Sequence, residues 1–200
     1  MTCVCLTRNR REWLPKAIQY FQGQTYQNRE LLILADGDEV SDLVPNDKRI
    51  RLIHLEGHPE IGEKRNLGCQ LTRGDIIAHW DDDDYSAPER LADQIARLRE
   101  TGKSVTGYHT MRFTDGAKWW LFWSLPHRAC GTSLMYKREW WERNRFPSKQ
   151  VGEDVDFVVV AHTAGALISV DAGDMMHASI HPGNSSPRPL DNNQWRELPA

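Results

Sequence analysis

The sequence predicts a single α/β domain in which a mostly parallel β-sheet is flanked by helices. Its 200 residues are 40% hydrophobic and 26% charged, which is typical of one soluble globular domain. In the first half, short apolar runs alternate with segments whose apolar residues recur at helical spacing, and this alternation indicates β/α units. The runs are continuously apolar, so they predict strands that are buried on both faces, as in a parallel sheet covered by helices.

Four apolar runs in the first half predict the strands of this sheet. They span residues 3–7, 31–35, 50–55 and 75–80. The second run ends at the turn signal Asp36-Gly37-Asp38, and the fourth ends at four consecutive aspartates, Asp81–Asp84. Ligands in open α/β sheets bind at the carboxyl ends of the strands, so these two acidic turns mark the predicted ligand-binding edge.

Three helices are predicted between and after these strands. The apolar face of the first is made of Leu14, Ala17, Ile18 and Phe21. The second covers about residues 63–71. The third follows Ser86-Ala87-Pro88-Glu89, which has the pattern of a capping box with proline in the first helical turn. Its predicted buried face contains Leu91, Ile95 and Leu98.

The second half of the chain is less regular. Asp115-Gly116 predicts a small β-hairpin between residues 111–113 and the aromatic stretch 119–123. Residues 131–136 predict another strand, and residues 157–162 predict the interior of a helix.

No linker or internal repeat divides the chain, so we expect one domain over residues 1–184, followed by an irregular tail over residues 185–200. A net charge of −3 gives no overall basic footprint for nucleic acid. No apolar stretch approaches the roughly 20 residues of a membrane-spanning helix, and we expect a cytoplasmic protein. The cysteines form no C-x-x-C pair and are expected to be reduced core residues.

The run Asp81–Asp84 is the feature that says most about function. Carboxylates gathered at the end of a buried strand repel one another, so such a cluster is tolerated mainly where a cation neutralises it. Carboxylate oxygens suit Mg²⁺ or Mn²⁺, which bind one or two protein carboxylates and leave positions open for substrate phosphates. The alternative is a solvated acidic turn that caps the following helix. A metal site is the leading hypothesis.

Five motifs in chain order resemble those of family 2 glycosyltransferases with the GT-A fold. They are Thr7-Arg8-Asn9-Arg10, Leu34-Ala35-Asp36-Gly37, Gly62–Gly68, Gly74-Asp75 followed by the aspartate run as a D-x-D motif, and Gly152-Glu153-Asp154. The resemblance extends over about residues 3–184, and the order makes the combination specific although each motif alone is weak. It implies an inverting transfer of one sugar from a nucleotide diphosphate, with UDP as the first candidate. The chain has no Gln-x-x-Arg-Trp motif, so we do not expect a processive synthase.

The resemblance also implies which residues bind the donor. Asp83 would bind the metal, and Asp81 and Asp82 would contact the metal, its bound waters or the ribose. His181 is the candidate further metal ligand, with His177 as its alternative, and an imidazole ligand favours Mn²⁺ slightly over Mg²⁺. The implied nucleotide-binding residues are Thr7, Arg8, Arg10, Asp36 and Arg65.

Two departures from the family pattern leave the nucleotide open. Arg8 stands where many members carry an aromatic residue that stacks on the base, although a guanidinium plane can also stack. Ala35 replaces the first acid of the usual pair. The nucleotide could therefore be other than UDP.

The resemblance places the catalytic step at Asp154, with Glu153 beside it in the E-D motif. A carboxylate within hydrogen-bond reach can take the proton of the attacking acceptor hydroxyl as a general base. The alternative interpretation is that these acids only enrich the N-terminus of a helix with favourable negative charge.

Aromatic and basic residues are interleaved in the middle of the chain and hint at an anionic acceptor. They are Trp119, Trp120, Trp123, Trp140 and Trp141, with Lys118, Arg128, Lys137, Arg138, Arg143, Arg145 and Lys149. The candidate acceptors are a glycan, a lipid-linked sugar and a modified base in DNA. Two other functions remain open from the sequence: a metal-dependent nuclease or phosphotransferase, and a non-catalytic module that binds a nucleotide sugar.

Overall fold

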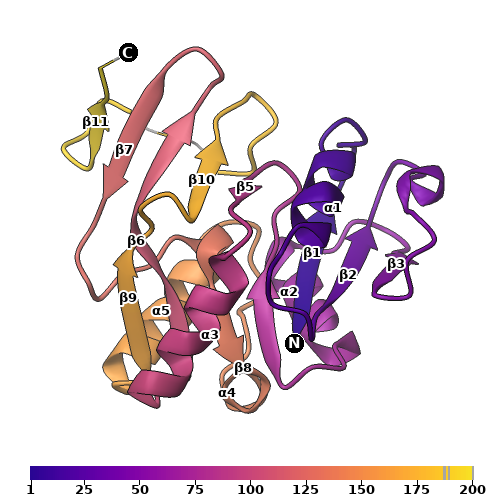
Figure 1. The fold of residues 1–200 in the computed structure, drawn as a ribbon, viewed down its shortest axis with the longest axis horizontal. Helices are drawn as coiled ribbons and strands as arrows, with labels where there is room; N and C mark the ends of the chain where they lie inside the picture. The colour runs from indigo at the N-terminus through magenta and orange to yellow at the C-terminus, as the bar shows by residue number, and fades with distance from the viewer. Residues whose placement is uncertain (187, 189, 200) are drawn as a thin grey trace.

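The computed structural model describes residues 1–186, 188 and 190–199, and Figure 1 shows its fold. The first half contains β1 (Thr2–Thr7), α1 (Leu14–Gln22), β2 (Glu30–Ala35), the 3₁₀ helix η1 (Ser41–Leu43), β3 (Ile50–His54), α2 (Ile61–Leu71), β4 (Ile76–His79), β5 (Tyr85–Ser86) and α3 (Arg90–Thr101). The second half contains β6 (Val105–Thr114), β7 (Trp119–Trp123), the 3₁₀ helix η2 (Gly131–Ser133), β8 (Met135–Lys137), α4 (Arg138–Arg143), α5 (Glu153–Thr163), β9 (Leu167–Asp171), β10 (Met176–Ser179) and β11 (Trp195–Glu197).

One mixed sheet runs through the molecule in the order β11-β7-β6-β8-β4-β1-β2-β3, with β9 and β10 paired to β6 and β5 paired to β10. In the first half, β4, β1, β2 and β3 run parallel to one another. In the second half, β7 and β8 run antiparallel to β6, whereas β9 and β10 run parallel to it. The predicted α/β domain with a mostly parallel sheet flanked by helices is confirmed. The predicted hairpin is also present, as β6 and β7.

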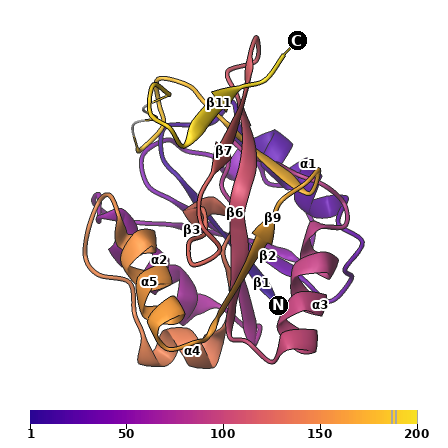
Figure 2. The same cartoon turned by 90° about the vertical axis from the view of Figure 1, so that its left-hand side faces the viewer.

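Helices cover both faces of the sheet. In the view of Figure 2, α2, α4 and α5 lie on one side of it, and α1 and α3 lie on the other. The first core packs α1 and α3 against the sheet and includes Phe21, Trp80 and Leu91. The second core, on the opposite face, includes Trp140 and Trp141 of α4. These two tryptophans are buried and do not form the acceptor surface for which the sequence made them candidates.

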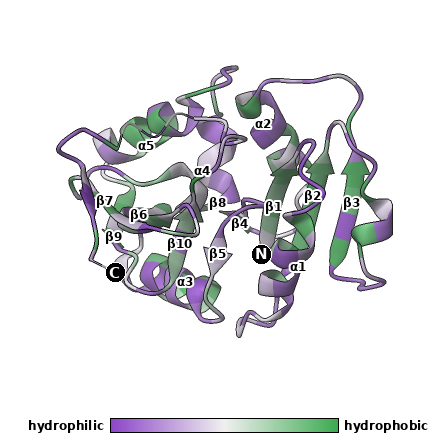
Figure 3. Cartoon of the chain, turned by 90° about the horizontal axis from the view of Figure 1, so that it is seen from above, coloured by the Kyte–Doolittle hydropathy of each residue, from purple (hydrophilic) through white to green (hydrophobic). Residues whose placement is uncertain are grey.

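The central strands are as apolar as predicted. The green colour of β1 and β2 in Figure 3 marks continuous hydrophobic runs, and Leu31 to Leu34 of β2 are fully buried. Helix α2 approaches β1 closely, because a Cβ on Gly68 would lie 2.5 Å from Val4 Cγ1. Gly68 therefore has a packing role, since it lets α2 lie close against β1.

Two predicted element starts differ in the structure. Helix α3 begins at Arg90, so the predicted capping box at Ser86 is wrong: Ser86 belongs to β5, and its Oγ accepts a hydrogen bond from Arg90 Nη1 at 2.8 Å. The capping box of the chain lies instead at α2, where Glu60 and Glu63 each bond the other's backbone N–H. Residues 131–136 are a 3₁₀ turn that leads into β8 at Met135 rather than one strand.

The tail is not wholly irregular, because Trp195–Glu197 form β11, which pairs antiparallel with β7. The free edge of β7 supplies unpaired backbone groups, and Trp195 packs on Phe113 and Phe122 with ring centroids 4.7 and 4.9 Å away. The expectation of an irregular tail is therefore wrong for these residues, while the domain boundary near residue 184 remains a prediction. None of the helices in the described part of the chain combines the length and apolar character needed to cross a membrane.

Candidate functional site

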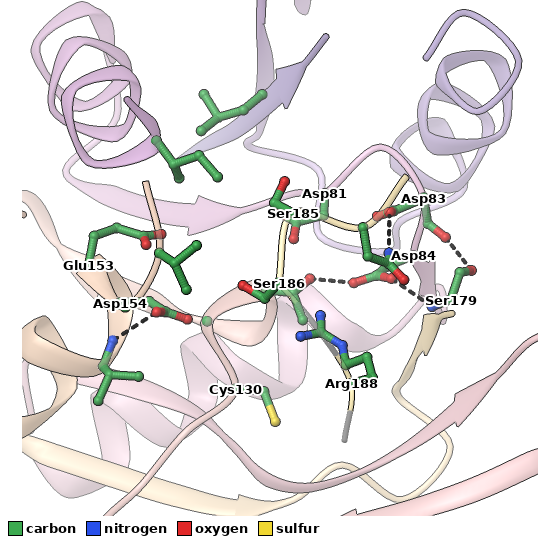
Figure 4. Close-up of a pocket in the computed structure, with 18 of the residues that line it drawn as sticks. Asp81, Asp83, Asp84, Cys130, Glu153, Asp154, Ser179, Ser185, Ser186 and Arg188 are labelled. Atoms are coloured by element: carbon green, nitrogen blue, oxygen red, sulfur yellow. Dashed lines mark hydrogen bonds between the residues drawn. The ribbon is translucent and has the colours of Figure 1, made fainter. Parts of the chain in front are cut away.

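A cavity of about 760 Å³ opens at the carboxyl ends of β1 and β4. Its walls include Thr7, Arg8 and Arg10 after β1, the run Asp81–Asp84 after β4, and Glu153 and Asp154 at the start of α5. Figure 4 shows the acidic side chains from β4 and from α5 in the same close-up. The structure thus brings together most of the site residues that the sequence singled out, at the edge of the sheet where a ligand was expected.

The aspartates of the run are packed tightly. Asp81, Asp83 and Asp84 can each offer a carboxylate oxygen within 4.8 Å of the others. Burial raises the pKa of Asp82 to about 6, and the charge of Asp83 adds to the rise. Burial likewise raises the pKa of Asp81 and of Asp84. Since Asp82 and Asp84 are only 2% and 8% exposed, the alternative of a solvated acidic turn is wrong.

Neighbouring polar groups fix the orientation of these carboxylates. Arg10 Nη1 donates to Asp82 Oδ1 at 2.9 Å and to Asp83 Oδ2 at 3.0 Å. Asp84 accepts from Thr132 Oγ1 at 2.5 Å and from the backbone N–H of Ser179 at 3.0 Å. Hydrogen bonds therefore hold Asp84 to two flanking segments. Asp83 lines the cavity and is paired with Arg10.

His181 lies against the aspartates, and His177 does not. His181 Nε2 is 2.9 Å from Asp83 Oδ2, and its ring stacks on Trp13 with centroids 4.7 Å apart. The backbone N–H of Gly183 donates to His181 Nδ1 at 3.1 Å, so Nε2 is the nitrogen that faces the aspartates. The ring of His177 instead stacks on that of Tyr85, 4.5 Å away between centroids. Of the two candidate ligands, the geometry favours His181.

The residues present fit a divalent cation. Clustered carboxylate oxygens and one imidazole nitrogen form a donor set suited to Mn²⁺ or Mg²⁺. Asp82 Oδ2 is buried and has no hydrogen-bond partner among the described residues, which is a costly state for a carboxylate oxygen. Asp81, Asp83 and Asp84 could hold such an ion, and His181 beside Asp83 is the candidate further ligand.

Glu153 and Asp154 begin α5 but have different surroundings. Arg65 Nε donates to Glu153 Oε1 at 2.8 Å in a buried ion pair, and burial raises the pKa of Glu153. Asp154 Oδ1 accepts only the adjacent backbone N–H of Val155, at 2.8 Å, among the described residues. Its Oδ2 lies against Gly131, where a Cβ would approach it to 1.7 Å. Asp154 is the carboxylate available to a substrate.

Comparison with known proteins decides the family. The model of the family described as "Glycosyl transferase family 2" matches residues 2–172. The chain belongs to glycosyl transferase family 2. Among curated relatives, the putative glycosyltransferase EpsH of Bacillus subtilis (strain 168) is 24% identical, over 86% of this chain and 58% of its own length. An uncharacterized glycosyltransferase of Haemophilus influenzae is 29% identical, over 42% of this chain and 36% of its own length.

Solved glycosyltransferases share the GT-A fold of this family 2 member. S. aureus TarS in complex with UDP-GlcNAc superposes with a TM-score of 0.76 at 16% identity, over 92% of this chain and 59% of the TarS chain. The mannosyltransferase PcManGT from Pyrobaculum calidifontis, in complex with GDP-Man and Mn²⁺, gives 0.70 at 15% identity, over 90% of this chain and 56% of its own. The chain thus spans less than two thirds of the length of each of these relatives.

In this family 2 member, Asp36 lies behind the cavity wall rather than in it. Its carboxylate is buried, and Oδ1 accepts from Lys64 Nζ at 2.7 Å. Oδ2 is 3.7 Å from Arg8 Nε and 3.6 Å from His58 Nδ1. Arg8 and Lys64 line the cavity in front of it. The sequence analysis missed Lys64, whose only signal is its place beside Arg65 in the Gly62–Gly68 motif.

The acceptor surface differs from the one the sequence suggested. Of the basic residues named for it, Arg128 lines the cavity. Arg138 instead donates to the carbonyl oxygens of Thr72 and Gly74, and the Arg145 guanidinium lies over the Trp141 ring at 5.0 Å. Further cavity residues come from segments that gave no sequence signal: Cys130, Arg188, Gln194 and Trp195.

Proposed function

We propose that the chain transfers a single sugar from a nucleotide-diphosphate sugar to an acceptor hydroxyl, with a divalent ion and with inversion at the anomeric carbon. The observation that carries this proposal is one cavity that contains the clustered aspartates Asp81–Asp84 and a separate, unpaired carboxylate, Asp154. The complexes of TarS with UDP-GlcNAc and of PcManGT with GDP-Man and Mn²⁺ support a nucleotide-sugar donor and a metal. UDP is the first candidate nucleotide.

The donor half of the cavity follows from the aspartates. Asp83, Asp81 and His181 are proposed to hold Mn²⁺ or Mg²⁺, which when bound stabilises the charge of the departing diphosphate as a Lewis acid. Asp82 is proposed to accept a hydrogen bond from a ribose hydroxyl, and the lack of a hydrogen-bond partner for its Oδ2 among the described residues supports this role. Arg10 holds Asp82 and Asp83 in position from the other side.

The nucleotide is proposed to lie along the wall formed by Thr7, Arg8 and Lys64. Arg8 has a side chain that is 46% exposed, so its guanidinium plane is accessible for stacking on a base. The buried Asp36 carboxylate would act through Arg8 and Lys64, which it attracts, rather than through direct contact.

The acceptor half is proposed to centre on Asp154, which takes the proton of the attacking hydroxyl as a general base. Attack from this side displaces the nucleotide in a single step, so the anomeric configuration inverts. The buried pair of Arg65 and Glu153 positions the first turn of α5 and hence Asp154. The role of Arg65 is therefore proposed to be support of the base rather than direct contact with the nucleotide.

Two substitutions separate these roles. Asp83→Ala should abolish both sugar transfer and the Mn²⁺-dependent binding of nucleotide, because it removes the proposed metal ligand. Asp154→Asn should keep nucleotide binding and lose transfer by about 10²- to 10⁴-fold, which is the usual contribution of a general base. Asp174→Asn is the matched control, since the Asp174 side chain is 88% exposed.

Thermal unfolding with UDP, GDP and their sugar conjugates, with and without Mn²⁺, identifies the donor. A nucleotide present at 100 times its Kd stabilises the folded state by about 2.7 kcal/mol, which raises Tm by roughly 5 to 10 °C for a chain of this size. Donor hydrolysis in the same samples distinguishes an enzyme from a binding module. The proposal fails if no nucleotide raises Tm with Mn²⁺, or if Asp83→Ala retains full transfer.

A further inference from the structure

Two arginines of the cavity, Arg128 and Arg188, have no carboxylate partner among the described residues. The other cationic residues of the cavity wall are each within ion-pair distance of a carboxylate: Arg8 and Lys64 with Asp36, Arg10 with Asp82 and Asp83, and Arg65 with Glu153. Their charge is balanced by the protein itself. The charge of Arg128 and Arg188 is available to a ligand.

Arg128 belongs to the acceptor half of the cavity. It lies in the segment between β7 and η2, three residues before Gly131, and Gly131 abuts the Asp154 carboxylate. Arg128 is exposed and makes no side-chain hydrogen bond to any described residue. This unpaired guanidinium lines the same cavity as the proposed base and is available to a group on the acceptor.

Arg188 enters the same cavity from the tail. Figure 4 shows its guanidinium pointing into the cavity, near Cys130 and Ser186. Its Cζ lies over the Phe113 ring at 5.5 Å, and its buried Nε lacks a hydrogen-bond partner among the described residues. Aromatic stacking holds the guanidinium plane in place, which lowers the entropy lost when it binds an anion. A buried N–H donor without a partner is itself a sign of an absent acceptor atom.

The donor does not use up these two charges. A nucleotide-diphosphate sugar carries two negative charges on its diphosphate, and the divalent ion that accompanies it carries two positive charges. In the proposed function the diphosphate is held by this ion and the aspartate run, so neither Arg128 nor Arg188 belongs to the donor site, and both keep their lack of a carboxylate partner among the described residues when the donor is bound. Guanidinium groups match the geometry of phosphate oxygens and bind them in bidentate fashion.

We infer that the acceptor carries a phosphate group, which Arg128 and Arg188 bind while its hydroxyl is presented to Asp154. This inference rests on the proposed function and names the class of its acceptor. Among the acceptors considered, it favours a phosphate-bearing molecule over a neutral glycan.

The test uses inorganic phosphate as the probe and the protein saturated with UDP and Mg²⁺, so that the donor diphosphate site is already filled. Phosphate is titrated by calorimetry into this complex and into its Arg128→Gln and Arg188→Gln variants. Each variant should bind phosphate about tenfold or more weakly, since a hydrogen bond to a charged group contributes at least that factor. UDP affinity should change less than twofold. Arg99→Gln, an exposed arginine on α3 outside the cavity lining, is the control.

Three results would overturn the inference. The first is that the UDP-Mg²⁺ complex of the parent protein binds no phosphate, and the second is that both variants bind phosphate as tightly as the parent does. The third is that the variants lose UDP affinity and keep phosphate affinity, which would assign the arginines to the donor diphosphate. These results leave the proposed transferase function intact, because they require UDP and Mg²⁺ to bind. A protein that binds no nucleotide with metal would overturn both.

Discussion

We expect Asp82 to make the metal-free protein more stable at mildly acidic pH than at neutral pH. Its carboxyl is 2% exposed, and burial and the charge of Asp83 raise its pKa from the ordinary 3.8 to about 6. Between these two values the folded state binds more protons than the unfolded state, so stability falls as pH rises through this window. The difference of about 2 pKa units amounts to about 3 kcal/mol in full, of which about half is lost between pH 5 and pH 7.5.

Asp82→Asn isolates this contribution, because it removes the titrating carboxyl and keeps its shape. Urea unfolding of both proteins in EDTA, followed by tryptophan fluorescence from pH 5 to pH 7.5, gives the stability of each. The stability of the parent protein relative to the variant should fall by about 1 kcal/mol across this range, whatever constant offset the substitution introduces. A difference that does not change with pH would refute the reasoning, since it would mean that the carboxyl is ionised throughout.

Two further substitutions test the packing of the site. Gly131→Ala should lower kcat by at least tenfold with unchanged UDP affinity, because its Cβ would lie 1.7 Å from Asp154 Oδ2 and displace the proposed base. The control is Gly23→Ala, where the added Cβ has no contact closer than 3.5 Å. Equal turnover of the two variants would contradict the assignment. Lys64→Met should lower the free energy of unfolding in urea by about 3 kcal/mol, because it leaves the Asp36 carboxylate buried without its main partner. The control is Lys48→Met at an exposed site. A loss of stability no larger than that of the control would contradict this prediction.

The sheet and the donor side of the site could be predicted because their signals are local. A continuous apolar run such as residues 31–35 is compatible with few environments other than a strand buried on both faces, and β2 spans Glu30–Ala35. Parallel strands place their carboxyl ends at one edge, so the acids after β4 fall beside Thr7 and Arg10. Order along the chain and direction in the sheet were sufficient for this part.

The rest depends on contacts between distant segments, which local patterns do not contain. Lysine is ordinarily a surface residue, and only the position of α2 against β2 places Lys64 on Asp36. From the sequence, Trp140 and Trp141 are candidates for exposed stacking groups, although core packing is more common for tryptophan, and the packing of α4 places both in the core. Arg188 lines the cavity, and the tail that carries it pairs with β7 through β11. The composition of this segment, which is rich in Pro, Asn and Ser, does not predict such a pairing.

The distribution of charge explains why the site needs a cation at one place and not at others. Asp36 has Lys64 as a buried partner, and Glu153 has Arg65, so each of these acids is neutralised within the fold. The aspartate run is not balanced in this way. Among the described residues, a single guanidinium, that of Arg10, pairs with both Asp82 and Asp83. The other ion-pair contact of the run is that of His181 with Asp83. Folding therefore leaves an excess of buried negative charge after β4, which a divalent ion relieves and which the protein's own side chains do not. We therefore expect a divalent ion to stabilise the folded protein when it binds here, because it would relieve the repulsion among these carboxylates.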